Sequence, residues 1–412
     1  MDTNCSEWLD RIRARPFTDP PSCSFGNTRD WVVSLQAVIA APFIKHLDIF
    51  SNLCVELEIS ISIKEGIVED QFETATTFES FSISDLLTIF EGWQRGCNPH
   101  WKSLVPIVNE KLESIITEPK KLEKLKTADF ALFASCWWPQ SDLSQLTILA
   151  FLSIWLFVWD DEIDESTGSL TDNLTAAQAF RAETVLFLEH CLGLSTWEDS
   201  WHEPGPIISS FKPIGDAISS VYNIDQRRNF MKEIIFFMEM SEIEQRRRLS
   251  PELPTIGEYW ECRMGTSAVG VCIAMLEFSC QFCSFATPWE RRFLWDKTNV
   301  IISLTNDLLS LKKEIELGCV DSLVPIAAAA DGNPQRAIDE AVAALYNLKA
   351  CFDEEIKTFL VTPTLQGQEK WTREFIKLCQ FNCTGNLTWS LSTKRYNVKE
   401  YIQGDGTIVF TL

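Results

Sequence analysis

Apolar residues recur at helical spacing along most of the chain from about residue 99 onward. Positions three and four residues apart share one face of a helix, so this periodicity predicts amphipathic helices. The predicted helical segments are 101–126, 141–164, 176–192, 213–248, 256–286, 289–317, 334–360 and 369–392. Prolines and glycines fall between several of them, where a helix is expected to end. The pattern therefore predicts an all-α protein.

Two short segments depart from the helical pattern. Residues 55–63 alternate strictly between apolar and polar side chains, which is the period of a half-buried strand. Residues 401–410 carry apolar residues on both sides of Gly404 and Gly406, which predicts a hairpin. Residues 1–95 have a mixed pattern and several prolines. We expect them to form an extension packed on the body, and residues 96–412 to form a single helical domain.

Composition narrows the class of protein. The chain has 412 residues, of which 46% are hydrophobic and 23% charged, and this excludes a mainly disordered protein. Its formal net charge is −22, so nucleic acid and anionic membranes are unfavourable partners because both would be repelled. A phosphorylated substrate remains compatible with this charge if metal ions lie between the protein and the phosphate.

The cellular location is predicted from the cysteines and the N-terminus. The 14 cysteines are scattered without paired spacing, and the first residues lack the basic and apolar regions of a signal peptide. Reduced thiols in the cytoplasm are therefore expected. The longest apolar run, residues 146–159, is shorter than the roughly 20 residues that cross a bilayer.

The segment 141–164 ends in a dense acidic cluster that contains Asp160, Asp161 and Asp164. Asp160 and Asp164 share one helical face, where like charges repel, and carboxylates at a helix C-terminus oppose the helix dipole. A divalent cation, Mg²⁺ above all, would offset both effects, because hard cations prefer carboxylate oxygens. Asp161 lies about 100° round the helix and is predicted to pair with a cation such as an arginine. The alternative is a solvated acidic helix end.

A second polar cluster occurs in the segment 289–317. Asn306, Ser310 and Glu314 are spaced four residues apart and so lie on one helical face. An amide, a hydroxyl and a carboxylate supply oxygen donors that can chelate one hard cation together. A polar stripe on an exposed face is the alternative, but its occurrence together with the first acidic cluster favours a metal site.

These two motifs, about 146 residues apart, resemble those of the class I terpene synthases. The segment from Arg263 to Ser267 resembles the part of that family that senses diphosphate, and Arg395-Tyr396 resembles its C-terminal pair. Trp389 is similar to the family's pocket tryptophan. The runs around Asn306 and Trp389 resemble fungal sesquiterpene cyclases of the presilphiperfolanol type. The resemblance covers about residues 98–400 and does not extend to the first 95.

The resemblance implies a fold, cofactors and a site. It implies one helical bundle around an apolar active-site cavity, about three Mg²⁺ ions, a prenyl diphosphate substrate and, as is usual among such enzymes, a homodimer. The implied metal ligands are Asp160, Asp164, Asn306, Ser310 and Glu314. The implied diphosphate-binding and catalytic side chains are Arg263, Lys313, Arg395 and Tyr396, with Asp160.

A carbocation intermediate would need an apolar wall of electron-rich rings, which stabilise a cation without attacking it. Phe157 lies three residues before Asp160 and so one turn deeper on the same face, and Trp389 is expected to approach from the last long helix. Trp137, Trp138, Trp155 and Trp159 are candidates only by proximity. Ordinary core packing is the alternative for each of these rings.

The predicted function is a sesquiterpene synthase that ionises farnesyl diphosphate and closes it between carbons 1 and 11, giving a humulene-type product. A diterpene cyclase acting on geranylgeranyl diphosphate is an alternative, and so is a non-catalytic helical scaffold. A chain-elongating prenyltransferase would usually carry a second aspartate-rich motif in place of the Asn306, Ser310 and Glu314 cluster. The run 246–248, three arginines after Glu242 and Glu244, is interpreted as a solvated helix face.

Overall fold

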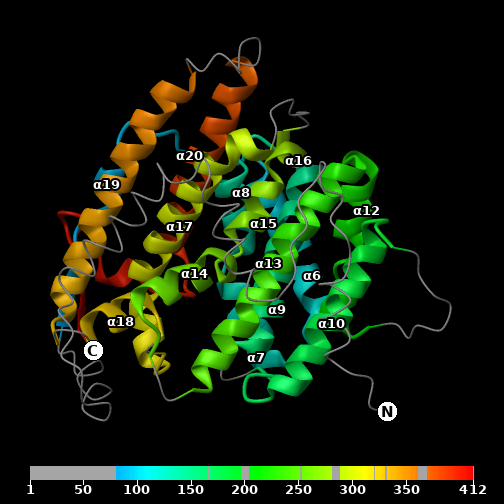
Figure 1. The fold of residues 1–412 in the computed structure, drawn as a ribbon, viewed down its shortest axis with the longest axis horizontal. Coiled ribbons are helices and arrows are strands. Elements are labelled where there is room, and N and C mark those ends of the chain that lie inside the picture. The colour runs from blue at the N-terminus through cyan, green and yellow to red at the C-terminus, as the bar shows by residue number, and fades with distance from the viewer. Residues whose placement is uncertain are drawn as a thin grey trace, which may run out of the picture. The chain divides into compact units, whose positions relative to one another are not determined.

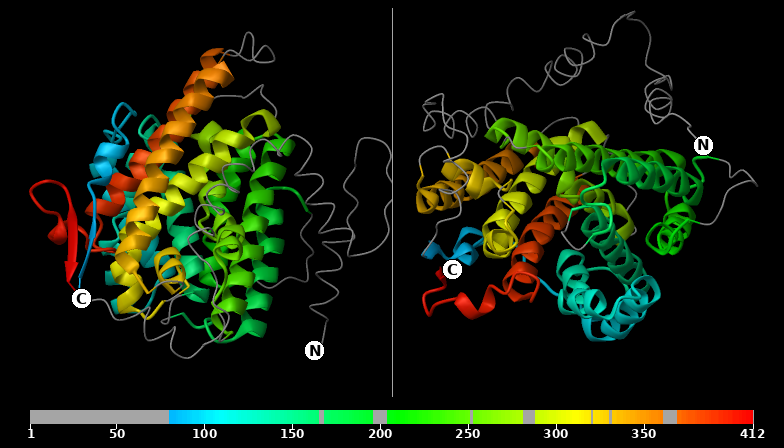
Figure 2. Two further views of the ribbon diagram at one scale, coloured as in Figure 1. Left: turned by 60° about the vertical axis from the view of Figure 1, so that its left-hand side comes forward. Right: turned by 90° about the horizontal axis from the view of Figure 1, so that it is seen from below.

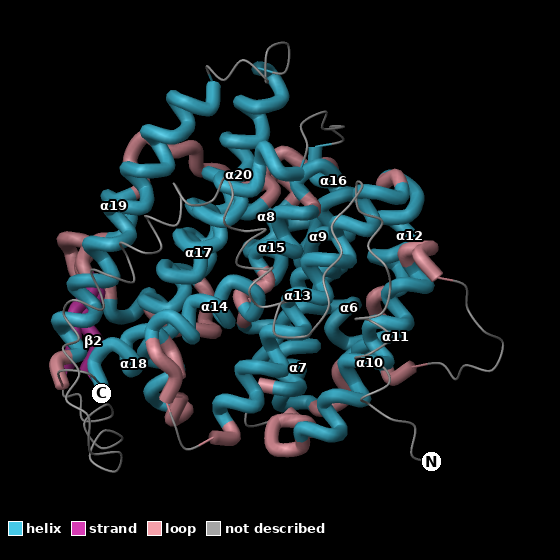
Figure 3. The backbone as a smooth tube through the Cα atoms, viewed as in Figure 1, coloured by secondary structure: helices cyan, strands magenta, loops and turns pink. Residues whose placement is uncertain are grey.

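The computed structural model describes residues 80–164, 168–195, 204–250, 253–280, 288–319, 321–329, 332–360 and 369–411. Within these ranges the chain is helical apart from one two-stranded sheet, so the all-α prediction is confirmed (Figures 1 and 3). The predicted strand 55–63 lies outside the described residues, as does most of the expected N-terminal extension. The predicted domain boundary near residue 95 stays a prediction.

Helix α9 (Leu143–Ile163) is the core helix of the body. The helices that pack against it include α6 (Trp101–Ile115), α8 (Phe130–Trp137) and α12 (Lys212–Val221). Because neighbours cover most of its circumference, α9 is apolar on nearly every side. Asp142 and Gln145 start it with a reciprocal capping box.

Among the described helices, α9 alone is long and apolar enough to cross a bilayer. The comparison with a bilayer in the sequence used only the apolar run 146–159, although the predicted helix 141–164 is close to the 21 residues of α9. Most of the apolar stretch is buried inside the fold. The length and the apolar composition of α9 are thus explained by its position in the core of the fold.

Three long helices, α17 (Pro288–Glu316), α19 (Pro334–Leu360) and α20 (Glu369–Ser392), lie side by side (Figures 1 and 2). Helix α20 also packs against α8, which in turn packs against α9. This chain of contacts brings α17 and α9 to the same interior space, although more than a hundred residues separate them in sequence.

Two predicted helices are each two helices in the structure. The segment 101–126 ends α6 at Ile115 and restarts as α7 (Pro119–Thr127), because a proline disfavours helical backbone in the residue before it. The segment 213–248 consists of α12 and α13 (Ile224–Arg248). Asn223 separates them, since its side chain caps α13 by accepting hydrogen bonds from the first backbone amides.

The predicted helix 256–286 is interrupted twice within its described part, giving α14 (Ile256–Thr266), α15 (Val269–Ala274) and α16 (Leu276–Cys280). At the first break Ala268 has a φ of 53°, a left-handed conformation that costs a residue with a Cβ about 1 kcal/mol. Asn299 of α17 holds this break. Its amide donates to the Met264 carbonyl at 2.7 Å and accepts from the Ser267 hydroxyl at 2.8 Å.

Strand β1 (Ser80–Ile83) pairs antiparallel with β2 (Ile408–Thr411), joining distant parts of the chain. The predicted hairpin at 401–410 is only partly correct. Ile402 does bridge to Ile408 around the turn, but the longer ladder is made with β1. The remaining described helices are α5 (Leu86–Ile89), α10 (Leu174–Cys191), α11 (Pro206–Ser209), α18 (Leu323–Ala329) and the short 3₁₀ helix η2 (Lys399–Tyr401).

Candidate active site

A cavity of about 480 Å³ is lined by residues of α8, α9, α13, α14, α15, α17 and α20. Its volume lies within the usual range for small-molecule sites. Apolar and aromatic side chains line part of its wall, and carboxylates, amides and guanidinium groups line another part. All eleven site residues predicted from the sequence line this one cavity: Phe157, Asp160, Asp164, Arg263, Asn306, Ser310, Lys313, Glu314, Trp389, Arg395 and Tyr396.

The acidic end of α9 presents its three aspartates to different surroundings. Asp161 is buried and forms an ion pair with Arg395, at 2.8 Å between Oδ1 and Nη2. This is the arginine pairing expected for Asp161. The Arg395 guanidinium also lies 5.0 Å from the centroid of the Phe157 ring. Arg395 therefore connects the loop after α20 to the end of α9.

Asp164 is held by Arg248, the last residue of α13. Arg248 Nη1 forms a short ion pair with the Asp164 carboxylate, and Nη2 donates to the Ile163 carbonyl at 2.9 Å. Arg247 and Arg248 both line the cavity. The interpretation of residues 246–248 as a solvated face is therefore wrong for these two and fits only Arg246. The last turn of α13 lies at the cavity. The charge pattern of residues 246–248 does not show where this turn lies.

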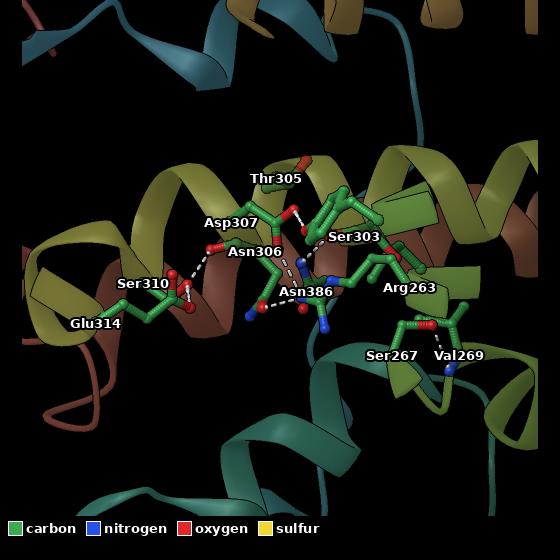
Figure 4. A network of polar contacts seen from close by, with 12 residues as sticks. Arg263, Ser267, Val269, Ser303, Thr305, Asn306, Asp307, Ser310, Glu314 and Asn386 are labelled. Carbon is green, nitrogen blue, oxygen red and sulfur yellow. Dashed lines mark hydrogen bonds and ion pairs between the residues drawn. The ribbon is translucent and has the colours of Figure 1, made fainter. Parts of the chain in front are cut away.

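The polar stripe of α17 is already joined by hydrogen bonds (Figure 4). The Asn306 amide donates to the Tyr396 hydroxyl at 2.7 Å and accepts from Arg263 Nη2 at 2.7 Å. The Ser310 hydroxyl lies 2.6 Å from Glu314 Oε1, to which it donates. Consequently the three predicted ligands share one face and point into the same space, together with Arg263.

Two residues that were not predicted from the sequence hold Arg263 in place. Asp307 contacts Arg263 directly, and Tyr259 contacts Asp307. Asp307 Oδ1 accepts from Arg263 Nη2 at 2.7 Å, and the Tyr259 hydroxyl makes a short hydrogen bond to Oδ2. Asp307 follows Asn306 in the sequence, so it lies on a different face of α17 from the three predicted ligands, and its side chain is buried. Its sequence position next to a predicted ligand was the available signal.

Carboxyl groups of both clusters have raised pKa values. Burial raises the pKa of Asp160 well above the usual range, and the neighbouring charges of Asp164 and Asp161 add to the effect. Burial also raises the pKa of Glu314, with Asp307 adding and the Ser310 hydroxyl opposing. These carboxylates are thus costly to ionise without a cation beside them.

The oxygen donors fit a hard divalent cation. Asp160 forms no side-chain hydrogen bond or ion pair with any other residue that the structure describes, and Glu314 Oε2 is buried without a hydrogen bond partner there. No three acidic, histidine or cysteine side chains of the described residues converge closely enough to hold a metal by themselves. Asp160 with Asp164, and Asn306 with Ser310 and Glu314, could each contribute oxygen donors to a bound cation.

Aromatic side chains from three helices form the deeper wall of the cavity. The rings of Phe157 and Trp389 lie 5.7 Å apart between centroids, in an edge-on arrangement. Phe133 of α8 lies 5.0 Å from Trp389 and 5.7 Å from Phe157. Trp389 is fixed by the hydrogen bond from its indole N–H to the Ala128 carbonyl at 2.7 Å.

Part of this wall was not predicted from the sequence. Phe133 and Phe237 line the cavity but were not predicted. Among the tryptophans considered by proximity, Trp137 lines the cavity, whereas Trp138, Trp155 and Trp159 are buried core residues outside it. Helix α8 is too short for its periodicity to be recognised, although the spacing of Phe133 and Trp137 was the available signal.

Comparison with known proteins identifies the family. Residues 152–348 match the family model described as terpene synthase family 2, C-terminal metal binding. The chain is 35% identical over 339 residues to the sesquiterpene cyclase hepA of Aspergillus oryzae, covering 79% of this chain and 92% of that protein. It is 26% identical to the silphinene synthase peniA of Penicillium patulum, covering 69% and 76% of the two chains.

Solved structures share the fold. The crystal structure of α-eudesmol synthase aligns with a TM-score of 0.59 at 18% identity, covering 73% of this chain and 97% of that one. The SVS_A2 protein, obtained by ancestral sequence reconstruction, aligns with a TM-score of 0.60 at 15% identity, covering 73% and 88%. The chain therefore belongs to the class I terpene synthase family and is a terpene cyclase similar to fungal sesquiterpene cyclases.

Proposed function

We propose that this terpene cyclase is a Mg²⁺-dependent sesquiterpene synthase, which ionises farnesyl diphosphate and closes the resulting cation between carbons 1 and 11. One observation carries the proposal. Two sets of oxygen donors, one on α9 and one on α17, border the same cavity of about 480 Å³, and apolar and aromatic side chains form another part of its wall. This arrangement suits a substrate with a charged head and a hydrocarbon tail.

The diphosphate head would lie between the two clusters. Asp160 and Asp164 would hold cations on one side, and Asn306, Ser310 and Glu314 would hold one on the other. When bound, these ions would neutralise the charge that develops on the departing diphosphate. The leaving group takes both electrons of the bond between carbon 1 and oxygen, and an allylic cation remains.

Cationic side chains would complete the binding of the leaving group. Arg263, Lys313 and Arg395 line the cavity, and each can donate charge-assisted hydrogen bonds to phosphate oxygens. Burial raises the pKa of Tyr396, so its hydroxyl stays protonated. Because that oxygen already accepts a hydrogen bond from Asn306, its own proton is available to donate.

The hydrocarbon part would fold against the rings of Phe157 and Trp389. Each ring stabilises a nearby cation by roughly 0.5–2 kcal/mol. Exclusion of water by this wall would keep the cation from being trapped early. We expect a humulene-type product if a proton is lost before further ring closure.

The substrate length and the closure mode need a direct test, because relatives of this chain carry the names of different products, among them silphinene and guaia-6,10(14)-diene. Purified protein is incubated with Mg²⁺ and either farnesyl or geranylgeranyl diphosphate, and products are identified by gas chromatography with mass spectrometry. A humulene-type C15 product with equal release of pyrophosphate is expected from the farnesyl substrate.

Each departure from this result has a distinct meaning. A main product from geranylgeranyl diphosphate would favour the diterpene alternative. A product of closure between carbons 1 and 10 would contradict the closure mode alone. Full turnover in excess EDTA would contradict the metal requirement. The Asp160→Asn variant is compared with wild type under the same conditions, because it removes the charge of one predicted ligand and keeps the shape of the side chain.

A further inference from the structure

Three consecutive arginines end α13, and each contacts a different partner. Arg246 is exposed and pairs with Glu242 on its own helix at 2.7 Å. Arg247 donates to the Glu258 carbonyl at 2.6 Å. Arg248 alone reaches the acidic end of α9. The three are alike in sequence but differ in what they can do.

Arg248 makes two contacts that suit the end of a helix. The last carbonyls of α9 have no partner within the helix, and the negative end of the helix dipole lies there. Nη2 satisfies the Ile163 carbonyl at 2.9 Å, while Nη1 pairs with the Asp164 carboxylate. One guanidinium thus offsets both the dipole and the carboxylate.

The charges around Arg248 are mostly acidic. Besides Asp164, it interacts electrostatically with Glu244, one turn earlier on α13, and with Asp321, in the loop after α17. Arg181 of α10 is the nearby cation, but its guanidinium is engaged with Gln245 at 2.9 Å and with the Ser241 carbonyl at 3.0 Å. Among the residues that the structure describes, Arg248 is therefore the cation in direct contact with Asp164.

This pair differs from the neighbouring pair of Asp161 and Arg395. The side chains of Arg395 and Asp161 are 10% and 5% exposed, whereas those of Arg248 and Asp164 are 21% and 42% exposed. A partly exposed ion pair such as Arg248–Asp164 can separate at low cost, because water replaces the lost contact. A buried pair cannot, since separation would leave an uncompensated charge.

We propose that Arg248 is a positioning residue that stands in for a cation at Asp164 in the metal-free enzyme and competes with metal for that carboxylate. The inference rests on the proposed role of Asp164 as a metal ligand. Arg248 holds the end of α9 in place while no metal is bound, and it releases Asp164 when a divalent cation binds beside Asp160. The concentration of metal needed to fill the site is thereby raised.

Direct metal binding tests this without substrate. Mn²⁺ is titrated into wild type, Arg248→Gln, Arg248→Lys and Arg246→Gln, and free Mn²⁺ is measured by electron paramagnetic resonance. Removing the charge at Arg248 should lower the dissociation constant about tenfold, because a positive charge next to the ligand is lost. Arg246→Gln removes a charge from the same helix end without touching Asp164, so its affinity should stay near that of wild type.

Two results would overturn the inference. The first is equal or weaker Mn²⁺ binding by Arg248→Gln, with the fold verified by circular dichroism. The second concerns Arg248→Lys, which keeps the positive charge and should bind Mn²⁺ as wild type does. If Arg248→Lys instead binds Mn²⁺ as tightly as Arg248→Gln, the charge argument is overturned. The proposed function fails separately, by absence of a C15 product from the wild-type enzyme, and that result does not enter the metal titration.

Discussion

The acidic end of α9 and the polar stripe of α17 border the same cavity, yet they are organised in opposite ways. The aspartates of α9 stand at a helix terminus, and two arginines from distant elements hold Asp161 and Asp164. The predicted ligands of α17 lie in its C-terminal turns, with Glu314 near the last residue of the helix, and hydrogen bonds to Arg263 and Tyr396 and between Ser310 and Glu314 hold them. The aspartates of α9 are therefore held mainly by opposite charges, and the polar side chains of α17 mainly by hydrogen bonds.

Because the two groups are held differently, substitutions in them should change the stability of the protein by different amounts. Asp160→Ala should reduce turnover at least about 1000-fold, because several kcal/mol of stabilisation of the leaving group would be lost. The same change should leave the thermal stability of the metal-free protein equal or higher, since it removes a carboxyl that repels its acidic neighbours. Steady-state kinetics and thermal melts in EDTA measure the two effects.

Asn306→Ala should also abolish turnover, but it should cost the fold about 1–2 kcal/mol, because Arg263 and the Tyr396 hydroxyl would each lose a hydrogen bond. Urea unfolding compares the two variants. A destabilised Asp160→Ala together with an unaffected Asn306→Ala would contradict the contrast between the two sides.

The buried pair at the α9 end gives the second test. Asp161→Asn leaves the Arg395 guanidinium buried without its counter-charge, and we expect a loss of about 3–5 kcal/mol in unfolding free energy. The matched control is Asp216→Asn, which breaks an exposed pair with Lys212 and should cost less than about 1 kcal/mol. Equal costs in urea titrations would show that Arg395 does not depend on Asp161.

The aromatic wall borders the same cavity, and removing one of its rings should have a smaller effect. Trp389→Leu removes a ring worth roughly 0.5–2 kcal/mol to a nearby cation, so the product mixture should shift toward earlier-quenched or acyclic species. Trp138→Leu is the control, because Trp138 is equally buried but does not line the cavity. An unchanged product profile in the Trp389 variant would remove that ring from the reacting region.

The smallest effect concerns a charge on α17 that lies outside the stripe. Burial raises the pKa of Asp296 to about 6, against the lowering effect of Arg292. The folded protein then binds a proton that the unfolded chain has released, so stability is lost as pH rises through 6. Asp296→Asn should flatten the dependence of the unfolding free energy between pH 5 and 7 by about 1 kcal/mol. An unaltered pH profile in urea titrations would contradict the raised pKa.

Helical spacing alone predicted the shared face of Asn306, Ser310 and Glu314, whereas the choice of Arg263, Arg395 and Trp389 came from the resemblance to a family. Asn306, Ser310 and Glu314 fall on one face because their spacing matches the helical repeat, whatever the rest of the chain does. The expectation that Asp161 pairs with an arginine followed from the same geometry, and Arg395 fulfils it. The all-α class followed from the repeat of apolar positions over many turns.

Tertiary structure alone decided which distant groups meet. Asp164 pairs with Arg248, 84 residues later, and the strand at Ser80–Ile83 pairs with the end of the chain at Ile408–Thr411. Neither contact has a local signature, because an arginine run looks the same whether its helix ends in solvent or at a cavity. The sequence sets the faces of helices through short-range spacing. Packing sets which faces confront each other, since burial depends on the whole chain at once.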